Sequence, residues 1–332
     1  MAPIIYAIAW LSGCSQPTPQ ATSAETAPIQ LQLNWFPDAQ HGGFYAALVH
    51  GDFAAENLDM KILPGGPNVP VVQAVASRRV PFAIANADQV LLGREQGADV
   101  VAVFAAMQDS PRCILVRADS DIRRLEDLRD ITLALGNGKA FAKFLQAKLP
   151  LEHVRIVPYS GSIAAMLADE KYAQQGYVFS EPLIARRQGM ETRCLMVSEL
   201  GFNPYTSVLI THPELIAEQP DLVLRAVRAV RRGWEQYLAS PEETNQRIHR
   251  DNPQMDLESL AFAADEIRSL CMPPDQPDNS LGEMTTERWA TLARQLADLG
   301  LLSGGAPSAG AFTNRFVEAA AASKKEDGHA PH

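Results

Sequence analysis

The strongest constraint on the fold is a regular alternation of short apolar segments with amphipathic helical segments between residues 29 and 106. The pattern predicts strands at 29–33, 59–63, 81–85 and 100–105, with helical periodicity between them. The segment from Val100 to Ala105 is almost wholly apolar, which is typical of a strand that is buried on both faces. This alternation predicts a parallel sheet covered by helices, and therefore an α/β fold.

A second α/β run follows and then gives way to helices. Strands are expected at 113–116, 131–135, 154–157, 176–179, 193–197 and 207–210. After Pro213 the pattern becomes helical, with amphipathic helices predicted at 221–238, 257–270 and 286–299. Ser240 and Glu243 predict a capping box, with Pro241 at the first helical position.

The first 28 residues differ from the rest of the chain. Residues 4–11 form an apolar run that is too short to span a bilayer, and the run ends in Leu-Ser-Gly-Cys. This ending resembles a bacterial lipoprotein box, which implies export and lipidation at Cys14, although no Lys or Arg precedes it. Residues 15–28 have the composition of a flexible linker, and we expect residues 319–332 to form a disordered tail.

Composition excludes some classes of partner and site. Hydrophobic residues make up 46% of the 332-residue chain, enough for a sizeable core, and a net charge of -10 argues against a nucleic-acid partner. None of the four cysteines forms a CxxC pair or has metal-type spacing with His, so we expect neither a metal nor a cofactor. Cys113 and Cys194 lie in apolar strands as buried thiols, although an oxidising compartment would permit one bridge.

Polar and aromatic residues collect on loops at the predicted strand ends, where ligands bind in open α/β sheets. Trp35 offers a flat face for a planar ligand, and Gly42 and Gly43 allow close backbone approach. The candidate ligand-binding residues on these loops and on the second crossover are Trp35, His41, Tyr45, Asn86, Asp88, Gln108, Ser110, Tyr159, Ser160, Gly161, Glu181 and Tyr205.

Each candidate also has a purely structural interpretation. Trp35 fits equally well as a core residue that covers the first strand, Asp88 and Ser160 as helix N-caps, and Glu181 as a first-turn acid that complements the helix dipole. The chain contains no G-x-S-x-G, H-E-x-x-H or dinucleotide-binding fingerprint. We therefore predict no catalytic residue.

Two motifs resemble the thiamine-pyrimidine-precursor family, which includes solute-binding proteins of ABC importers and a hydroxymethylpyrimidine synthase. They are Asn34-Trp35-Phe36-Pro37, followed by His41 and Tyr45, and Glu181-Pro182 at the end of residues 175–182; weaker similarity lies at 83–90 and 108–111. The resemblance spans residues 29–302. It implies a type II periplasmic-binding-protein fold, with two parallel-sheet lobes joined by two crossovers at 113–117 and 207–211. Lobe one would comprise 29–116 with 207–318, and lobe two 117–206.

The resemblance also implies a function. A periplasmic or envelope-located, lipid-anchored and monomeric binding protein would deliver a small planar nitrogen heterocycle to an ABC permease and ATPase. A thiamine pyrimidine precursor is the first candidate, stacked on Trp35 and hydrogen-bonded to Glu181; riboflavin, nitrate, sulfonate and taurine are alternatives. The synthase branch carries a cysteine-rich cluster near the second crossover, but residues 201–206 contain no Cys, which favours binding over catalysis. A regulatory pair of lobes without transport is a third class.

Overall fold

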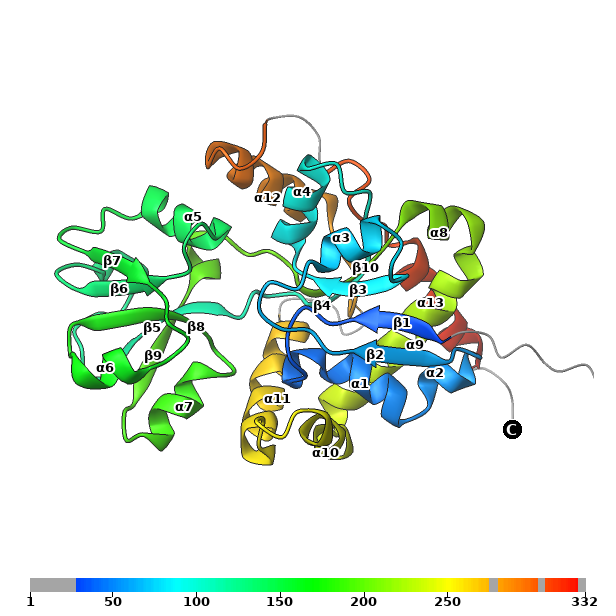
Figure 1. Ribbon diagram of the computed structural model, residues 1–332, viewed down its shortest axis with the longest axis horizontal. Helices are drawn as coiled ribbons and strands as arrows, with labels where there is room; N and C mark the ends of the chain where they lie inside the picture. Colours follow the sequence, from blue (N-terminus) through cyan, green and yellow to red (C-terminus); the bar gives the residue numbers. More distant parts are fainter. Residues whose placement is uncertain (1–27, 275–279, 304–307, 328–332) are drawn as a thin grey trace, which may run out of the picture.

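The computed structural model describes residues 28–274, 280–303 and 308–327. The predicted lipidation site Cys14 and the linker up to residue 27 lie outside this part of the chain. Within it, the chain forms two five-stranded sheets with helices packed around each, which Figure 1 shows side by side and joined in the middle. We refer to the first sheet and its helices as lobe one, and to the second sheet and its helices as lobe two.

The sheet of lobe one has the strand order β2-β1-β3-β10-β4. Strand β1 pairs in parallel with β2 and β3, whereas β10 is antiparallel to both β3 and β4. The four strands predicted up to residue 106 are present within two residues of their expected ends. The bounds are β1 (Ile29–Gln32), β2 (Met60–Leu63), β3 (Phe82–Ala85), β4 (Val101–Met107) and β10 (Thr206–Thr211).

The sheet of lobe two has the order β7-β6-β8-β5-β9, with β5 antiparallel to β8 and β9. Its strands are β5 (Arg112–Arg117), β6 (Thr132–Leu135), β7 (Arg155–Pro158), β8 (Tyr172–Tyr177) and β9 (Thr192–Met196). The strand predicted at 176–179 was placed too late, because Gln174 and Gln175 suggested a loop. Both are buried, and the side chain of Gln175 accepts a hydrogen bond from the backbone N–H of Gly136.

The two sheets are mixed rather than parallel, which corrects the prediction. Each receives its single antiparallel strand, β10 or β5, from a chain segment that arrives from the other lobe. The crossings therefore lie between β4 and β5 and between β9 and β10, at 108–111 and 197–205. The expected crossing segments at 113–117 and 207–211 are instead inner strands of their sheets.

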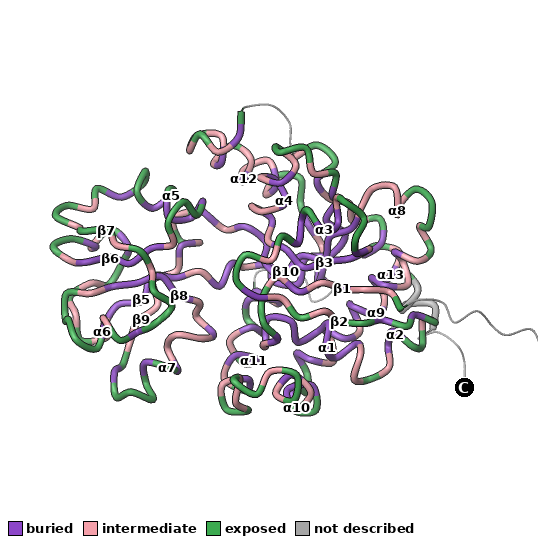
Figure 2. Tube along the Cα trace, in the orientation of Figure 1, coloured by how far each residue is buried: buried purple, intermediate pink, exposed green. Residues whose placement is uncertain are grey.

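Helices cover both faces of the sheet of lobe one. Successive residues of β3 alternate between two cores: Phe82 and Ile84 face α1, α9, α11 and α13, whereas Ala83 and Ala85 face α3, α4 and α12. Strands in both lobes are mostly buried along their length, and the outer edge of lobe two is more exposed (Figure 2). The helices of lobe one are α1 (Gly42–Val49), α2 (Asp52–Ala55), α3 (Val71–Ala76), α4 (Ala87–Glu95), α8 (Pro213–Glu218), α9 (Pro220–Ala239), α10 (Glu242–Asp251), α11 (Leu257–Cys271), α12 (Thr286–Asp298) and α13 (Arg315–Asp327).

Helices α1 and α9 are in direct contact because glycines remove side chains from their interface. A Cβ atom on Gly43 would lie 2.1 Å from the indole of Trp234, and one on Gly233 would lie 2.2 Å from the carbonyl oxygen of Gly43. Trp234 is fully buried and meets Phe44 edge to face at 5.7 Å between ring centroids. The close approach expected at this glycine pair is thus made to α9.

Two predictions about the helices are wrong. Pro241 is itself the N-cap of α10 and the capping box is absent, because the helix begins at Glu242 without a side-chain cap. The tail expected to be disordered from 319 is helical up to Asp327, because Phe316, Val317 and Ala320 of α13 bury their side chains in the core beside α9. Lobe two carries α5 (Ala140–Lys148), α6 (Ala164–Ala168) and α7 (Glu181–Arg187), and short 3-10 turns lie at η1 (Ala39–His41), η2 (Leu125–Asp127) and η3 (Val197–Leu200).

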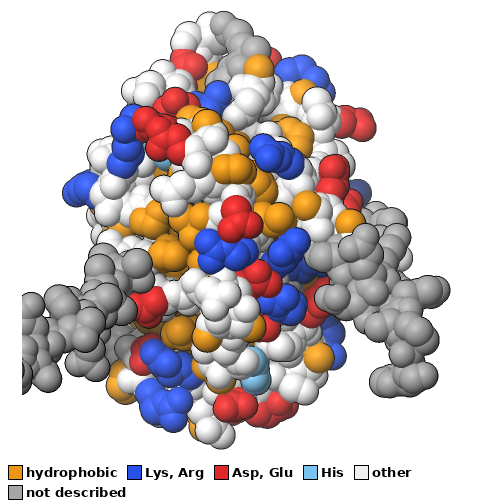
Figure 3. Space-filling model, turned by 90° about the vertical axis from the view of Figure 1, so that its right-hand side faces the viewer, with side chains coloured by type: hydrophobic (Ala, Val, Ile, Leu, Met, Phe, Trp, Pro, Cys, Tyr) orange, Lys and Arg blue, Asp and Glu red, His pale blue; other side chains and the backbone are white. Residues whose placement is uncertain are grey.

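The surface of lobe one that faces away from lobe two mixes both charge signs with apolar side chains (Figure 3). Among the helices of the described residues, none combines the length and the apolar character that crossing a bilayer requires.

Candidate functional site

The topology turns the strand-end loops of the two lobes toward each other. In lobe one, β1 and β3 run in parallel, so the loops after both strands lie at the same edge of the sheet. In lobe two, Arg112 at the start of β5 pairs with Tyr177 at the end of β8, and β6 and β7 run in the direction of β8. The ends of β6, β7 and β8 therefore lie on the side where the chain enters from lobe one. We call this region the junction.

Lobe one contributes two exposed aromatic side chains to the junction edge. Trp35 and Phe36 are 43% and 45% exposed, and their rings meet edge to face with centroids 5.5 Å apart. A Cβ atom on Gly66, on the loop after β2, would lie 3.4 Å from the Phe36 ring. The interpretation of Trp35 as a buried core residue is therefore excluded.

The His41 side chain lies on the buried side of this loop. It is fully buried, its Nε2 lies 2.9 Å from Asn34 Oδ1, and burial lowers the pKa of His41 to about 3. The proton on Nε2 that this contact requires leaves Nδ1 as an acceptor, 3.5 Å from Asp38 Oδ1. Burial raises the pKa of Asp38 to about 7, against hydrogen bonds from Gln40. His41 Nδ1 has no hydrogen-bond partner among the described residues, so His41 supports the loop through its contact with Asn34.

The start of α4 brings a carboxylate toward lobe two. Asn86 occupies the N-cap position, and its backbone N–H donates to the side chain of Gln89. Asp88 lies in the first turn rather than at the cap, which corrects its structural interpretation. Its Oδ1 is buried without a hydrogen-bond partner among the described residues. Burial raises the pKa of Asp88, while a backbone hydrogen bond from Gln89 and the charges of Arg112 and Lys139 oppose that shift.

Lobe two contributes a hydrogen-bonded carboxylate. Glu181 is the first residue of α7; its Oε1 accepts a hydrogen bond from the Tyr159 hydroxyl at 2.8 Å, and its Oε2 accepts one from the Tyr177 N–H at 2.7 Å. Burial and the neighbouring Glu181 charge raise the pKa of Tyr159 well above its usual range. Glu181 therefore holds Tyr159 in place, in addition to complementing the helix start.

Arg112 is a junction residue to which the sequence interpretation gave no role. Its guanidinium carbon lies 4.5 Å from the Phe141 ring centroid and 4.2 Å from that of Tyr177, and its Nη2 donates to the Tyr177 hydroxyl at 2.9 Å. A cation is thus held between two aromatic rings of lobe two and acts on Asp88 of lobe one. Its position in the sequence, directly after Pro111 in the first crossover, was the feature that could have indicated a role at the junction.

Several predicted ligand-binding residues serve the fold instead. Tyr45 and Tyr205 are each 2% exposed: Tyr45 belongs to the core around α1, and the Tyr205 hydroxyl accepts a hydrogen bond from the Thr285 N–H at 3.0 Å. The Gln108 side chain donates to two backbone carbonyls, and Ser110 is also buried. Ser160 and Gly161 are exposed, next to Tyr159.

The two crossovers are held together by one arginine of α12. Arg288 donates to the carbonyl oxygens of Gln108 in the first crossover and Asn203 in the second, and its guanidinium lies 4.1 Å from the Tyr205 ring centroid. Asn203 also bridges the strands by donating to Asp109 Oδ1 at 2.6 Å and accepting from the Ser110 N–H at 2.8 Å. Both crossovers are thereby fixed to lobe one.

A second contact between the lobes lies at the far end of α7. Arg187 donates to both carboxylate oxygens of Asp256 at 2.8 Å, to Glu258 at 2.7 Å and to Ser259 at 2.9 Å, all at the start of α11. We call this contact the latch. Because α7 begins at Glu181 and ends at Arg187, one short helix carries both a junction residue and the latch.

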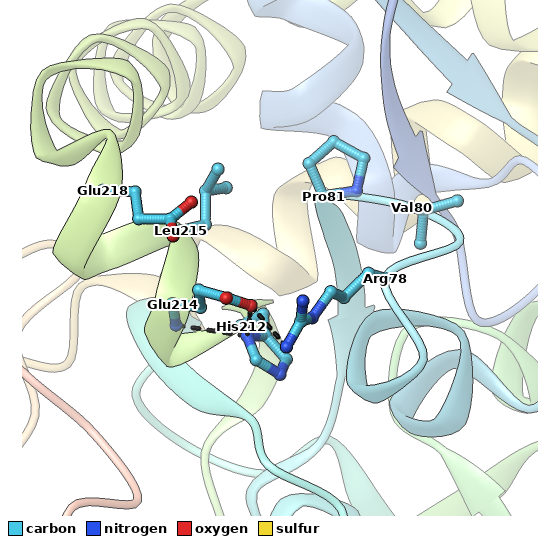
Figure 4. Close-up of a pocket in the computed structure, with 7 residues that line it drawn as sticks. All are labelled: Arg78, Val80, Pro81, His212, Glu214, Leu215 and Glu218. Carbon is cyan, nitrogen blue, oxygen red and sulfur yellow. Dashed lines mark hydrogen bonds and ion pairs between the residues drawn. The ribbon is translucent and has the colours of Figure 1, made fainter.

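Two hollows lie beside the sheets, one in lobe one away from the junction and one in lobe two at the carboxyl ends of β6 and β7. One, of about 240 Å³, lies at the amino end of β3, where Arg78 and Glu214 form an ion pair beside His212 (Figure 4). The other, of about 170 Å³, is lined by residues of β6, α5 and β7. Neither is lined by a predicted site residue. Among the described residues, no group of three His, Cys, Asp or Glu side chains could hold a metal ion.

The chemistry of the junction suits recognition rather than bond making. It offers aromatic faces, an unpartnered carboxylate oxygen and an immobilised guanidinium. The nearby thiol of Cys113 is a poor nucleophile, because its hydrogen bond to Cys194 and its burial raise its pKa well above the usual range.

Comparison with known proteins agrees with this chemistry. A sequence model of the family described as NMT1/THI5 like matches residues 38–244, more than half of the chain. The chain belongs to this family. It is 27% identical to the riboflavin-binding protein RibY of Chloroflexus aurantiacus, over 94% of this chain and 96% of that protein. It is 23% identical to a formylaminopyrimidine-binding protein of Halalkalibacterium halodurans, over 86% and 89% of the two chains.

The fold is shared with a periplasmic sulfonate-binding protein, SsuA, of Methylobacillus flagellatus KT. The TM-score is 0.67 at 13% sequence identity, with 92% of this chain and 97% of that chain covered. The predicted periplasmic-binding-protein fold is confirmed. The predicted class, a binding protein of this family rather than an enzyme, is also confirmed by the two binding-protein relatives.

Proposed function

We propose that this family member is the substrate-binding component of an ABC importer, and that it captures a small planar nitrogen heterocycle at the junction. Two relatives that match most of the chain are named for ligands of this chemistry, a flavin and a pyrimidine. The junction supports the same class, because an exposed aromatic pair on lobe one lies at the edge that faces a polar, hydrogen-bonding set on lobe two.

The observation that carries the proposal is the combination of Trp35 with Asp88. The indole is exposed at the end of β1, and Asp88 Oδ1 is buried without a partner among the described residues. A flat ring stacked on the indole gains affinity with little discrimination, whereas an N–H group donated to the carboxylate supplies selectivity. Amino-pyrimidines have both features, so a thiamine pyrimidine precursor remains our first ligand.

The structure changes the role that we assign to Glu181. Both of its oxygens already accept hydrogen bonds, so a ligand N–H has to share an oxygen with Tyr159 or Tyr177. We therefore assign Glu181 to orienting the Tyr159 hydroxyl, and Asp88 to accepting from the ligand. Riboflavin is the second candidate, favoured by the similarity to RibY along almost the whole chain.

Calorimetry with a ligand panel tests the proposal. Hydroxymethylpyrimidine, its formylamino relative, riboflavin and taurine are titrated into the wild type, Trp35→Ala and Asp88→Asn, with Ile156→Ala as a control that removes an equally exposed apolar side chain of lobe two. Trp35→Ala should cost about 1–3 kcal/mol of binding free energy for ring ligands. Asp88→Asn should weaken amino-pyrimidines more than riboflavin. Tight taurine binding that is indifferent to Trp35 would refute the proposal.

The same proposal extends to location and partners. We propose that the protein acts in the periplasm or cell envelope as a monomer, held to the membrane by lipid on Cys14 and docking on an ABC permease and ATPase. The basis is the Leu-Ser-Gly-Cys sequence with the polar segment that follows it. Since one acyl chain gives only marginal membrane binding, stable anchoring needs more than one. Cys14→Ser should move the protein from the membrane to the soluble fraction, and a cytoplasmic wild-type protein would contradict this.

A further inference from the structure

Two cysteines of lobe two face each other across neighbouring strands. Cys113 on β5 and Cys194 on β9 have their Sγ atoms 3.1 Å apart. The antiparallel register pairs Leu115 with Cys194 and Cys113 with Met196, so the two cysteines are diagonal neighbours on one face of the sheet. The sulfur atoms are in contact but unbonded, and an approach of about 1 Å would bring them to the disulfide bond length of roughly 2.0 Å.

The surroundings favour a reaction between these two thiols and no other. Cys113 is fully buried, Cys194 is partly exposed, and Cys194 packs against the small core formed around Leu115 and Met166. The third cysteine of the described residues, Cys271, is buried in α11 of lobe one. An oxidant can therefore reach Cys194 first, while Cys113 is positioned to displace it.

We propose that Cys113 and Cys194 form a disulfide when the protein meets a small-molecule or protein disulfide in an oxidising compartment. The Cys194 thiolate attacks the oxidant disulfide, which forms a mixed disulfide and releases one thiol. The Cys113 thiol is a poor nucleophile toward groups in solution, but it is held 3.1 Å from Cys194 Sγ. It attacks that sulfur, gives up its proton and expels the second thiol. The two cysteines are oxidised by two electrons in total, and the oxidant is reduced to two thiols.

The disulfide would cross-link lobe two. It joins residues that are 81 positions apart, and the closed loop contains β6, β7 and β8 with their helices. Cross-linking a long loop restricts the unfolded chain strongly, so the oxidised protein should be the more stable form. The bridge would also secure β9, an edge strand, to β5, which begins with the junction residue Arg112. The inference does not depend on which ligand binds.

Thiol mapping tests the proposal. The full-length chain with Cys14→Ser is equilibrated with oxidised glutathione, denatured with an alkylating agent and no reductant, and digested with trypsin. A cross-link between peptides 113–117 and 194–225 is expected, with Cys271 as the alkylated residue of peptide 269–288. Full alkylation of Cys113, Cys194 and Cys271 under these conditions would overturn the proposal, and so would a bridge that includes Cys271.

Matched variants separate bridge formation from misfolding. Cys271→Ser should keep the cross-link, whereas Cys194→Ser should abolish it and leave Cys113 alkylated. Reduction should lower the thermal midpoint of the wild type and of Cys271→Ser by roughly 5 °C, and should leave that of Cys194→Ser unchanged. If Cys194→Ser failed to fold, the cross-link and the reduction-dependent midpoint in Cys271→Ser would still decide the question. An equal midpoint with and without reductant in Cys271→Ser would count against it.

Discussion

Arg187→Gln should open the protein by weakening the latch. In the wild type, the Arg187 guanidinium binds Asp256 through two hydrogen bonds of 2.8 Å and reaches Glu258 and Ser259 as well. Glutamine keeps most of the side-chain length but carries no charge and cannot form the two-pronged contact. Arg187 belongs to lobe two and its partners belong to lobe one. Losing these bonds therefore destabilises the closed arrangement of the lobes relative to an open one.

The size of the free-energy loss in Arg187→Gln follows from the solvent exposure of the latch side chains. The side chains of Arg187, Asp256 and Glu258 are 35%, 51% and 72% exposed, so each ion pair is screened by water. Exposed pairs contribute about 0.2–1 kcal/mol, and bidentate geometry places this one near the upper end. A loss of about 1 kcal/mol changes the closed-to-open ratio roughly fivefold. Ligand affinity should fall by up to the same factor if closure is required for tight binding.

Small-angle scattering and calorimetry measure the two consequences. Arg187→Gln should show a larger radius of gyration than the wild type without ligand, and a weaker dissociation constant for whichever ligand of the panel binds. High salt should reproduce the effect in the wild type by screening the pair. The contact with Arg187 holds the pKa of Asp256 well below its usual range. The stabilisation that ionised Asp256 gives to the latch is therefore complete above the unfolded pKa of about 3.9 and is lost only as the pH falls below it. The strength of the latch should be constant between pH 5 and pH 8.

Arg117→Gln is the matched control. Arg117 also contacts both oxygens of one carboxylate, that of Asp119, but the pair lies within lobe two. This substitution should leave the radius of gyration and the ligand affinity unchanged. Equal behaviour of Arg187→Gln and Arg117→Gln would show that the latch does not hold the lobes together. Asp256 is unsuitable for this test, because it also caps α11 by accepting a hydrogen bond from the Ser259 N–H.

Three further predictions concern the scaffold. Gly43→Ala should cost about 3 kcal/mol of unfolding free energy in urea titrations, because the new methyl group would collide with the Trp234 indole; a cost below about 1 kcal/mol would contradict the packing. Asp38→Asn should gain stability relative to the wild type between pH 4 and pH 7. In the wild type, the pKa of Asp38 is raised from 3.8 to about 7, so the free energy of unfolding falls as the pH rises between these values. The lowered pKa of His41 makes the free energy of unfolding rise over part of the same range, but this occurs in both proteins. A difference independent of pH would refute that assignment. Arg288→Gln should lower the free energy of unfolding by about 2 kcal/mol, since it leaves buried carbonyl groups of both crossovers unpaired.

The sequence was most informative where local and tertiary preferences coincide. The strands of lobe one alternate or are wholly apolar, and each is followed by a helical period, so their positions were predicted within two residues. The strand β8 was misplaced because buried glutamines look polar in a sequence, and only the folded structure shows that Gln175 accepts a hydrogen bond from Gly136. The helix α13 was missed because its apolar positions are few and its stability comes from packing on α9.

The candidate site was predictable as a set of loops but not as a set of roles. Trp35 is exposed, which was one of its two interpretations, whereas His41 and Tyr45, in the same motif, are buried. One sequence motif thus contains both exposed and buried side chains. Residue type alone does not show which side chains point to solvent. Arg112 was given no role from the sequence. Its role depends on Phe141 and Tyr177, which approach it only in the folded lobe.

The contacts of Arg288 and of the latch differ in a way that indicates how the protein would open. Arg288 is half-buried, desolvation lowers its pKa, and it donates hydrogen bonds to backbone carbonyls of both crossovers. Hydrogen bonds of a charged group contribute about 1.5–3 kcal/mol each, more than an exposed ion pair such as the latch. Opening should therefore break the contacts of Arg187 first and leave the crossovers fixed to lobe one. Because Glu181 and Arg187 belong to the same seven-residue helix, a ligand that orders the start of α7 would also favour the latch at its end.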